Sequence, residues 1–423
     1  MFLIYQIVIL LIILLSPIII IIRLLKNKEH KKRFIEKFCF FQKKRNKGNL
    51  IWIHAASVGE LMSIIPLIYE IEKNKKINTI LITTSTLSSS KIFENYKFKK
   101  VIHQFFPIDF FYFSSKFIEY WKPCVAIFID SEIWPSMFKK LKKKSVPLLL
   151  MNARITPKSF ARWNFFNKFS KNIFLNISKA YPQNLESKIF LKKLKVKKIN
   201  KLGNLKFCEE KKVRKLNLDK TFLLSIKNRL IFCASSTHPG EEINIAKTHL
   251  VLKKKYKSLL TIIIPRHVDR IENIYKDLKL HNLNTIIRSS KKKINLNTDI
   301  YLVNTYGETK KFFNISKIVF IGGSIVNHGG QNPIEPARFG LNILHGPNIQ
   351  NFRDIYQLFD KYKIAYKFVN LKQLINISDK LLLSKKRKKL NLSNMGNLIL
   401  KKHLIEINKI LNNELKKTKI LGL

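Results

Sequence analysis

The segment from 320 to 340 holds the residues whose types and spacing point most clearly to a binding site. The apolar run 318–321 predicts a buried parallel strand, which ends at Gly322-Gly323, and Gly329-Gly330 follows. A predicted helix start comes next, with Asn332, Pro333, Ile334 and Glu335. Glycine lets a backbone approach a ligand closely, and amides at a helix start attract anions. Because a carboxylate repels phosphate but suits ribose hydroxyls, the segment predicts a site for a nucleotide-sugar donor.

Glu60 follows a predicted strand at 50–54 and opens a predicted helix in the sequence Ser57-Val-Gly-Glu60. The helix dipole stabilises a carboxylate at a helix start, so one interpretation is a helix cap. The other is a general base, which an inverting sugar transfer needs to take the proton from the attacking hydroxyl. The motif by itself leaves both interpretations open.

Asp130 and Glu132 come directly after the apolar run 125–129 and before Trp134-Pro135. Two acids at the end of a strand could orient sugar hydroxyls or stabilise positive charge that develops at an anomeric carbon. The alternative is a helix cap beside a buried Trp134.

Lys206 lies in the sequence Gly203-Asn-Leu-Lys206, just before a predicted linker. A lysine in a cleft can neutralise a leaving phosphate. In a chain with this many lysines, an ordinary surface role is the strong alternative.

Arg266 and His267 follow the apolar run 259–264, and Arg270 comes shortly after them. Arginine presents a planar fork that matches phosphate, and histidine can hydrogen-bond the same group. Arginine is scarce among the many lysines, so Arg154, Arg266 and Arg270 carry more weight than any lysine. A weaker signal is the loop Asn304-Thr-Tyr-Gly307-Glu308-Thr309, whose amides could contact a nucleotide.

Several common motifs are missing from the sequence. It has no Gly-x-x-x-x-Gly-Lys-Ser/Thr loop and no Gly-x-Gly-x-x-Gly, which removes support for those nucleotide-binding signatures. There is no Asp-x-Asp motif, and the four cysteines form no Cys-x-x-Cys pair. We therefore predict a transferase without a metal or cofactor.

Strands, turns and helices alternate along the chain, which predicts parallel sheets covered by helices. The predicted strands are 50–54, 77–83, 101–106, 125–129, 146–151, 230–234, 259–264, 284–287, 300–303, 318–321 and 343–344. The polar residues above follow the carboxyl ends of these strands, where open α/β sheets bind ligands. We predict two doubly wound α/β domains facing a cleft, at 48–208 and 230–423, with a linker at 209–229 and C-terminal helices in the second domain.

The first 22 residues carry no charge and consist mostly of Leu, Ile, Val and Phe. As a helix they would extend about 33 Å, enough to cross a bilayer core. The basic linker at 23–47 then predicts that everything after it is cytoplasmic. We predict a membrane-anchor helix at 1–22; because of Pro17, full spanning and a re-entrant or monotopic course both stay open.

The formal net charge is +53, from 80 Lys and Arg against 27 Asp and Glu. Such a charge usually suggests nucleic acid. Here the basic residues are mostly Lys, spread over nearly the whole chain with much Ile, Asn and Phe, which is typical of A/T-rich codon drift. We therefore expect anionic membrane surfaces and phosphorylated lipid as partners, and no nucleic acid.

Seven motifs taken together resemble the 3-deoxy-D-manno-octulosonic acid (Kdo) transferases of Gram-negative bacteria. The motifs are Ile51-Trp-Ile-His-Ala-Ala-Ser-Val-Gly-Glu60, Ser131-Glu-Ile-Trp-Pro135, Asn152-Ala-Arg154, Gly203-Asn-Leu-Lys-Phe207, Ser236-Thr-His-Pro-Gly-Glu-Glu242, Pro265-Arg-His267 and the block from Gly322 to Glu335. They occur in order, and the resemblance covers about 33–356. It implies a GT-B fold, which has two Rossmann-like domains with the active site between them.

The resemblance also implies transfer of Kdo from CMP-Kdo to the lipid A precursor, lipid IVA, at the cytoplasmic face of the inner membrane. This step adds the first sugar of the lipopolysaccharide core. By position, Glu60 matches the family's proton acceptor, and Asp130 and Lys206 match residues that stabilise the transition state. The matching CMP-binding positions are Arg266, His267, Gly307, Glu308, Thr309, Asn332, Pro333, Ile334 and Glu335.

Three positions depart from the family pattern. Asp130 stands in place of Glu, Gln331 in place of His, and Cys208 in place of Asp. None of them is Glu60 or Arg266, so we expect activity to persist.

Two other functions fit part of the sequence. A GT-B transferase could use another nucleotide sugar, such as a UDP-hexosamine, and competition by CMP against UDP separates the two. A basic membrane-tethered nucleic-acid binder predicts Lys and Arg on one face with aromatic platforms, whereas here glycines and acids are concentrated in loops.

Overall fold

The computed structural model describes residues 1–208, 218–384 and 390–420. The chain divides into two compact units, Met1–Lys211 with Ser393–Leu423, and Lys212–Leu392. This division corrects one prediction, which placed all C-terminal helices in the second domain. The last helix, α16 (Leu392–Ile420), returns to the first unit because its side chains pair with residues of that unit, among them Glu406 with Lys179.

The first unit contains a parallel sheet with the order β3-β2-β1-β4-β5-β6. Its strands are β1 (Leu50–His54), β2 (Thr79–Thr84), β3 (Val101–Phe105), β4 (Val125–Ile129), β5 (Leu148–Ala153) and β6 (Lys179–Pro182). The central strands are buried along their whole length, which explains why they read as unbroken apolar runs. The short edge strand β6 was not predicted.

The second unit contains a parallel sheet with the order β13-β12-β11-β7-β8-β10-β9. Its strands are β7 (Leu230–Thr237), β8 (Leu259–Pro265), β9 (Thr285–Ile287), β10 (Ile300–Leu302), β11 (Ile318–Ile321), β12 (Asn342–His345) and β13 (Ala365–Lys367). The edge strand β13 was missed. Two open, parallel α/β sheets confirm the predicted fold class.

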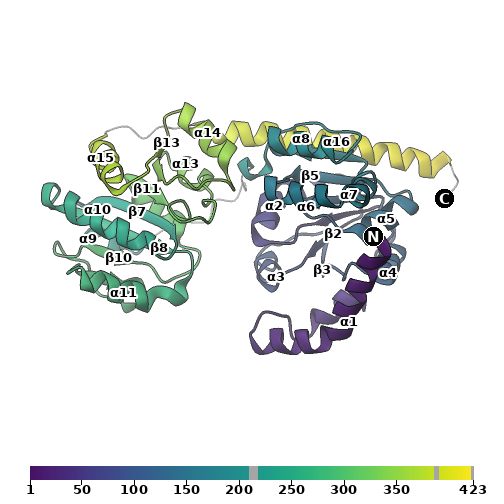
Figure 1. The fold of residues 1–423 in the computed structure, drawn as a ribbon, viewed down its shortest axis with the longest axis horizontal. Helices are drawn as coiled ribbons and strands as arrows, with labels where there is room; N and C mark the ends of the chain where they lie inside the picture. Colours follow the sequence, from purple (N-terminus) through teal and green to yellow (C-terminus); the bar gives the residue numbers. More distant parts are fainter. Residues whose placement is uncertain (209–217, 385–389, 421–423) are drawn as a thin grey trace. The chain divides into compact units, whose positions relative to one another are not determined.

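Helices flank each sheet (Figure 1). In the first unit they are α1 (Phe2–Leu25), α2 (Val58–Glu72), α3 (Leu87–Phe93), α4 (Phe111–Trp121), α5 (Pro135–Lys143), α6 (Pro157–Phe165), α7 (Asn167–Phe174), α8 (Leu185–Lys193) and α16. In the second unit they are α9 (Lys220–Ser225), α10 (Glu241–Lys255), α11 (Ile271–Leu280), α12 (Thr309–Ile315), α13 (Ile334–Arg338), α14 (Arg353–Lys361) and α15 (Leu371–Leu382). Short 3₁₀ turns are η1 (Arg33–Phe38), η2 (Leu205–Phe207), η3 (Val268–Arg270) and η4 (Arg288–Ser290).

Each unit has its own hydrophobic core. In the first, aromatic side chains fill the space between sheet and helices, with Trp52 and Phe117 rings 4.8 Å apart. In the second, aliphatic residues of β7, β8 and β11 pack under α10 and α15, which lie side by side (Figure 1). Separate cores allow each unit to position its own set of polar loops.

The predicted linker at 209–229 lies partly outside the described residues, since 209–217 are not described. Within 218–229 the structure has the helix α9 instead of an irregular connection. Phe222 of this helix is buried and its ring packs 5.0 Å from that of Tyr301. The lysine-rich composition hid the buried apolar residues Leu218, Phe222 and Ile226 from the sequence analysis.

The helix α1 is long and apolar enough to cross a membrane, with a mean hydropathy of 3.2. Both of its ends contact the first unit. At the start, Tyr5 donates a hydrogen bond to Asp109 at 2.8 Å, and Gln6 donates one to Ser136 at 2.8 Å. At the end, Arg23 pairs with Glu29 at 3.0 Å. Between these contacts Ser16 is the only residue of the helix that is buried.

Candidate active site

The first sheet reverses its strand order between β1 and β4, the place where open α/β sheets bind ligands. The loop after β1 leads to Glu60, and the loop after β4 holds Asp130 and Glu132. Parallel strands bring their carboxyl ends to one edge, so residues 70 positions apart in the chain share one site. Predicted catalytic residues of the first unit gather at this edge.

Glu60 caps the start of its helix, as one interpretation of its motif predicts. Its carboxylate accepts hydrogen bonds from the Ala56 amide at 2.8 Å and the Ser57 hydroxyl at 2.9 Å, and Ser57 caps the helix in return. Partial burial, and then the negative charges of Glu132 and Asp130, raise the pKa of Glu60 to about 7, although its hydrogen bonds oppose the rise. The capping box therefore orients a carboxylate whose pKa suits a general base at neutral pH.

Asp130 has a φ of +60°, which is uncommon for a residue with a side chain. Its backbone is held on both sides, because its amide donates to Met151 at 3.0 Å and its carbonyl accepts from Arg154 at 3.1 Å. Burial raises the pKa of Asp130, while the positive charges of Lys206 and Arg154 act in the opposite direction. A strained backbone over-determined by its neighbours is typical of functional positions.

Lys206 approaches Asp130 with its Nζ atom 3.8 Å from Oδ2. Burial lowers the pKa of Lys206, and the negative charges of Asp130 and Glu60 counteract this effect. The turn η2 holds the residue, since the Lys206 amide donates to Asn204 Oδ1 at 2.9 Å. Lys206 is thus not an ordinary surface lysine.

Glu132 lies between two ring nitrogens. Its Oε2 accepts a hydrogen bond from Trp134 Nε1 at 2.9 Å and lies 3.3 Å from Nε2 of the buried His54.

The helix-cap alternative for the two acids is wrong, because the N-cap of α5 is Trp134 and the amides of its first turn bond to Asp109. Asp109 lies 27 residues before Ser136, so the motif around Asp130 could not reveal it as the partner of this helix start.

The second sheet reverses its strand order between β7 and β11. Glu241 links the loops after these two strands. Its carboxylate accepts hydrogen bonds from the amides of Gly323 at 2.7 Å, Ser324 at 3.0 Å and Ile325 at 2.9 Å. The glycine block therefore follows β11 at the point where the sheet reverses its strand order, as predicted. Sequence reasoning had not assigned Glu241 this role.

Gly322 allows the two loops to approach each other. A Cβ atom on it would lie 2.2 Å from the carbonyl oxygen of Ser236. Ser236 itself has a φ of +56°. The close approach at Gly322 is therefore between two backbones of the protein, whereas the sequence prediction was an approach to a ligand.

A cluster of basic groups lies on this same edge. The rings of His238 and His328 are 4.1 Å apart, and that of His267 lies 6.3 Å from His238. Burial, and then the charges of His328, His267, Arg266 and Arg270, lower the pKa of His238 to about 4. A neutral His238 among cationic neighbours is suited to binding an anion. His238 and His328 belonged to the noted motifs but had not been selected as site residues.

Arg266 is exposed, and among the described residues none forms a hydrogen bond or ion pair with its guanidinium group. Its backbone amide donates to Thr237 at 3.0 Å, which fixes the position from which the side chain extends. Arg270, in contrast, is engaged by Glu242, with N–O distances of 3.1 Å. Arg266 is therefore the arginine with its planar fork available for a phosphate.

Glu308 is occupied by contacts inside the protein. It pairs with Arg288 at 3.2 Å and Lys311 at 3.0 Å and accepts a hydrogen bond from Thr305. Burial opposes these bonds, but together they lower the pKa of Glu308 to about 2. These contacts hold the loop in which Gly307 is exposed and Thr309 is partly buried, and CMP binding by residues 307–309 stays a prediction.

Asn332 precedes the short helix α13, and Glu335 lies in its first turn. Asn332 Oδ1 accepts a hydrogen bond from the Ile334 amide at 3.0 Å, and Pro333 is the N-cap residue. The Glu335 carboxylate is 42% exposed and lies 3.7 Å from Lys310 Nζ. The contact of this carboxylate with ribose hydroxyls stays a prediction.

Comparison with known proteins decides between the families that share this geometry. A family model described as 3-deoxy-D-manno-octulosonic-acid transferase matches residues 32–209. A relative with that function from Rickettsia prowazekii is 37% identical over 334 residues, which cover 79% of this chain and 72% of the relative. Another from Haemophilus influenzae is 29% identical over 384 residues, 88% of each chain. The chain belongs to the Kdo transferase family.

The Kdo transferase fold is that of nucleotide-sugar enzymes with two α/β units. The UDP-GlcNAc 2-epimerase of Neisseria meningitidis, solved with UDP-GlcNAc, matches 84% of this chain with a TM-score of 0.55 at 13% identity. This similarity supports the GT-B fold, and the family makes the chain a glycosyltransferase. The resemblance inferred from seven motifs is confirmed.

The predicted residues of this Kdo transferase fall into two sets, one on each unit. Glu60, Asp130 and Lys206 lie together on the first unit. Arg266 and His267, the loop at 307–309 and the segment 332–335 follow strands β8, β10 and β11 of the second. In the described part of the chain, no group of three or more His, Cys, Asp or Glu is arranged to hold a metal.

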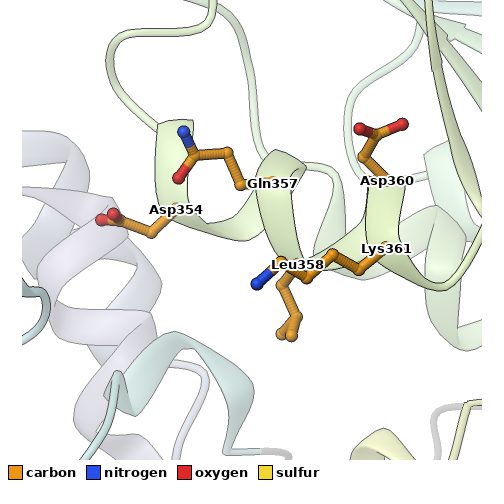
Figure 2. A pocket seen from close by; sticks show the side chains of 5 residues that line it. All are labelled: Asp354, Gln357, Leu358, Asp360 and Lys361. Atoms are coloured by element: carbon orange, nitrogen blue, oxygen red, sulfur yellow. The ribbon is translucent and has the colours of Figure 1, made fainter.

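A surface hollow lies beside α14 of the second unit. Figure 2 shows the side chains that line it, which are Asp354, Gln357, Leu358, Asp360 and Lys361. All five come from one helix, and none is a residue predicted for the site.

Proposed function

We propose that this Kdo transferase moves Kdo from CMP-Kdo to the lipid A precursor, lipid IVA, in lipopolysaccharide core biosynthesis. The observation that carries the proposal is the Glu60 carboxylate, oriented by a capping box and given a pKa of about 7 by burial and by Glu132 and Asp130. A carboxylate with this pKa can accept a proton at cellular pH. The family membership supplies the sugar, and the chemistry of the site supplies the mechanism.

In this mechanism Glu60 takes the proton of a hydroxyl on the glucosamine disaccharide of the acceptor. The oxygen attacks the anomeric carbon of Kdo while the bond from that carbon to the phosphate oxygen of CMP breaks. CMP leaves with the bonding electron pair, and the proton stays on Glu60 until it passes to water. A single displacement of this kind inverts the anomeric configuration.

Charge on the transferring groups is balanced by residues of both units. Lys206 stabilises negative charge as CMP departs, and Asp130 keeps the ammonium group in place at 3.8 Å. Arg266, whose fork has no hydrogen-bond or ion-pair partner among the residues that the structure describes, binds the CMP phosphate together with His267. Gly307, Thr309 and Glu335 contact the nucleoside, the last through its ribose hydroxyls.

We propose that α1 attaches the enzyme to the cytoplasmic face of the inner membrane by lying in the interface. An apolar surface of this size on one helix requires a cover. Tyr5 and Arg23, at opposite ends of the helix, both contact the first unit. A helix crossing the bilayer would move Tyr5 about 30 Å away from the side that holds Arg23. The docked helix therefore supports the monotopic course rather than the spanning one.

The first experiment is mass spectrometry of lipid IVA after incubation with the membrane-reconstituted protein and CMP-Kdo. We expect a mass gain of whole Kdo units, and none with a UDP-hexosamine. A gain only with the UDP sugar would overturn the donor assignment, and no gain with either would overturn the proposed reaction.

The Glu60→Gln variant tests the base in the same assay. Glutamine also forms a capping box, so the helix start is kept while proton acceptance is lost. We expect kcat to fall about 10²- to 10⁴-fold with unchanged CMP binding. A folded Glu60→Gln protein with wild-type turnover would rule out Glu60 as the base.

A further inference from the structure

The C-terminal helix α16 is in direct backbone contact with the turn that carries Lys206. A Cβ atom on Gly396 of this helix would lie 2.2 Å from the carbonyl oxygen of Phe207 and 3.2 Å from Cα of Cys208. The Cys208 thiol lies 3.4 Å from the Gly396 carbonyl oxygen and donates to it. Any side chain at 396 would have to push the helix and the turn η2 apart.

A second glycine, Gly203, lies just before the turn η2 and also packs closely against α16. Gly203 has a φ of +111°, and a Cβ atom on it would lie 2.6 Å from Cγ1 of Ile399. Glycine inside a helix costs about 0.5–1 kcal/mol relative to alanine. Gly396 thus weakens α16 as a helix, and the close approach to η2 explains its presence there.

The turn η2 is held on its other side by the sheet. Asn152, buried at the end of β5 with a φ of +52°, accepts a hydrogen bond from the Leu205 amide at 2.9 Å. Lys206 is therefore carried on a three-residue turn that lies between this strand end and α16. If α16 moved outward, the turn η2 would lose the contact that presses it toward Asn152.

The helix α16 is itself fixed to the first unit further along. Glu406 pairs with Lys179 and accepts a hydrogen bond from the Tyr181 hydroxyl at 2.9 Å. Asn412 accepts a hydrogen bond from Lys76 at 2.9 Å. These contacts make the helix a firm support rather than a loosely packed tail.

We propose that Gly396 of α16 is a positioning residue for Lys206. Because it has no side chain, the helix can pack closely against η2 and hold Lys206 in the site. The side chain of Lys206 then points to Asp130, 3.8 Å away, where the proposed reaction needs a positive charge. The proposal rests on the proposed function, because Lys206 has a catalytic role only if the chain transfers Kdo. It extends the site to a part of the chain almost 200 residues away.

The test compares Gly396→Ala with Asn397→Ala in the full-length, membrane-reconstituted enzyme. Asn397 is the next residue of the same helix and is exposed, so its change alters the helix without touching η2. We expect Gly396→Ala to lower kcat about 10- to 100-fold, as a displacement on the order of 1 Å does. The KM for CMP-Kdo and CMP affinity should stay within about twofold, and Asn397→Ala should match the wild type.

A milder variant guards against misfolding. Ile399→Val removes a methyl group that faces Gly203 without forcing an overlap, and we expect a smaller fall in kcat. Wild-type kcat in a folded Gly396→Ala protein with a lowered melting temperature would show that the glycine acts on stability alone, and would overturn the proposal.

A double-mutant cycle with Lys206→Ala separates positioning from general packing. If Gly396 acts through Lys206, adding Gly396→Ala to Lys206→Ala lowers kcat little further. Full additivity of the two losses would refute the positioning role. A failure of the proposed function is distinct from both results, because the wild-type protein would then transfer no Kdo.

Discussion

At the residue scale, the site combines local capping with long-range electrostatics. The hydrogen bonds of Glu60 come from residues within four positions of it, whereas the charges that raise its pKa come from Glu132 and Asp130 in the loop after β4. The local hydrogen bonds orient the carboxylate. Burial and the charges of residues distant in sequence raise its pKa. The helix-cap interpretation of the motif is confirmed, and the general-base interpretation stays a prediction that is compatible with it.

The pH dependence of transfer follows from the pKa of Glu60. A base with a pKa of about 7 is protonated at lower pH, so kcat/KM should fall about tenfold per unit below pH 7 and level off above it. Glu132→Gln removes a negative charge that raises this pKa, so the acid limb should shift downward by on the order of 1 pH unit. The measurement is a pH profile of kcat/KM for both proteins.

Two outcomes would contradict this account. An acid limb that does not move in Glu132→Gln would mean that Glu132 does not act on the base. An upward shift would give the charge effect the wrong sign. Glutamine can still accept from Trp134 Nε1, so lost geometry is not the expected cause of any change.

At the element scale, α1 shows how a very apolar helix can belong to a folded unit. Its first turn is held by Asp109, which also caps the start of α5. Burial raises the pKa of Asp109 to about 6, against the hydrogen bonds that it accepts. One carboxyl group thus joins two helices that are more than 100 residues apart in sequence.

The position of α1 predicts the side on which the amino terminus lies. An epitope tag fused before Met1 should be cleaved by protease in inverted inner-membrane vesicles, which expose the cytoplasmic face. A tag after Leu423 should be cleaved in the same vesicles and serves as the control. Protection of the amino-terminal tag, with cleavage of the other, would show that α1 spans the membrane.

At the scale of the whole molecule, each unit carries one half of the proposed chemistry. The acid and lysine cluster lies on the first unit, and the basic and glycine-rich loops lie on the second. Each set gathers where its own sheet reverses strand order. Binding of CMP and catalysis should therefore respond to different substitutions.

Arg266→Ala tests this division. The loss of charged hydrogen bonds to phosphate should weaken CMP binding about 10- to 100-fold, measured by calorimetry. Lys276→Ala removes a charge from an exposed position of α11 in the same unit and should bind CMP like the wild type. Equal affinity in Arg266→Ala and Lys276→Ala would remove Arg266 from the donor site.

Much of the fold could be predicted because buried parallel strands are unbroken apolar runs. The strands 50–54, 125–129 and 318–321 have the predicted bounds. The strands β6 and β13 were missed because edge strands are short and less apolar, and α9 because lysines surround its one buried aromatic residue. Because these elements are buried to different degrees, their sequences contain apolar runs of different length.

The sequence by itself determined the alternation of strands and helices, the seven motifs and hence the family, since these depend on residue type and local order. Only the tertiary structure decided the return of α16 to the first unit, the pairing of Lys206 with Asp130 and the joining of two loops by Glu241. These contacts link residues far apart in the chain. Their partners are chosen by how the sheets bring strand ends together, and no local pattern records that choice.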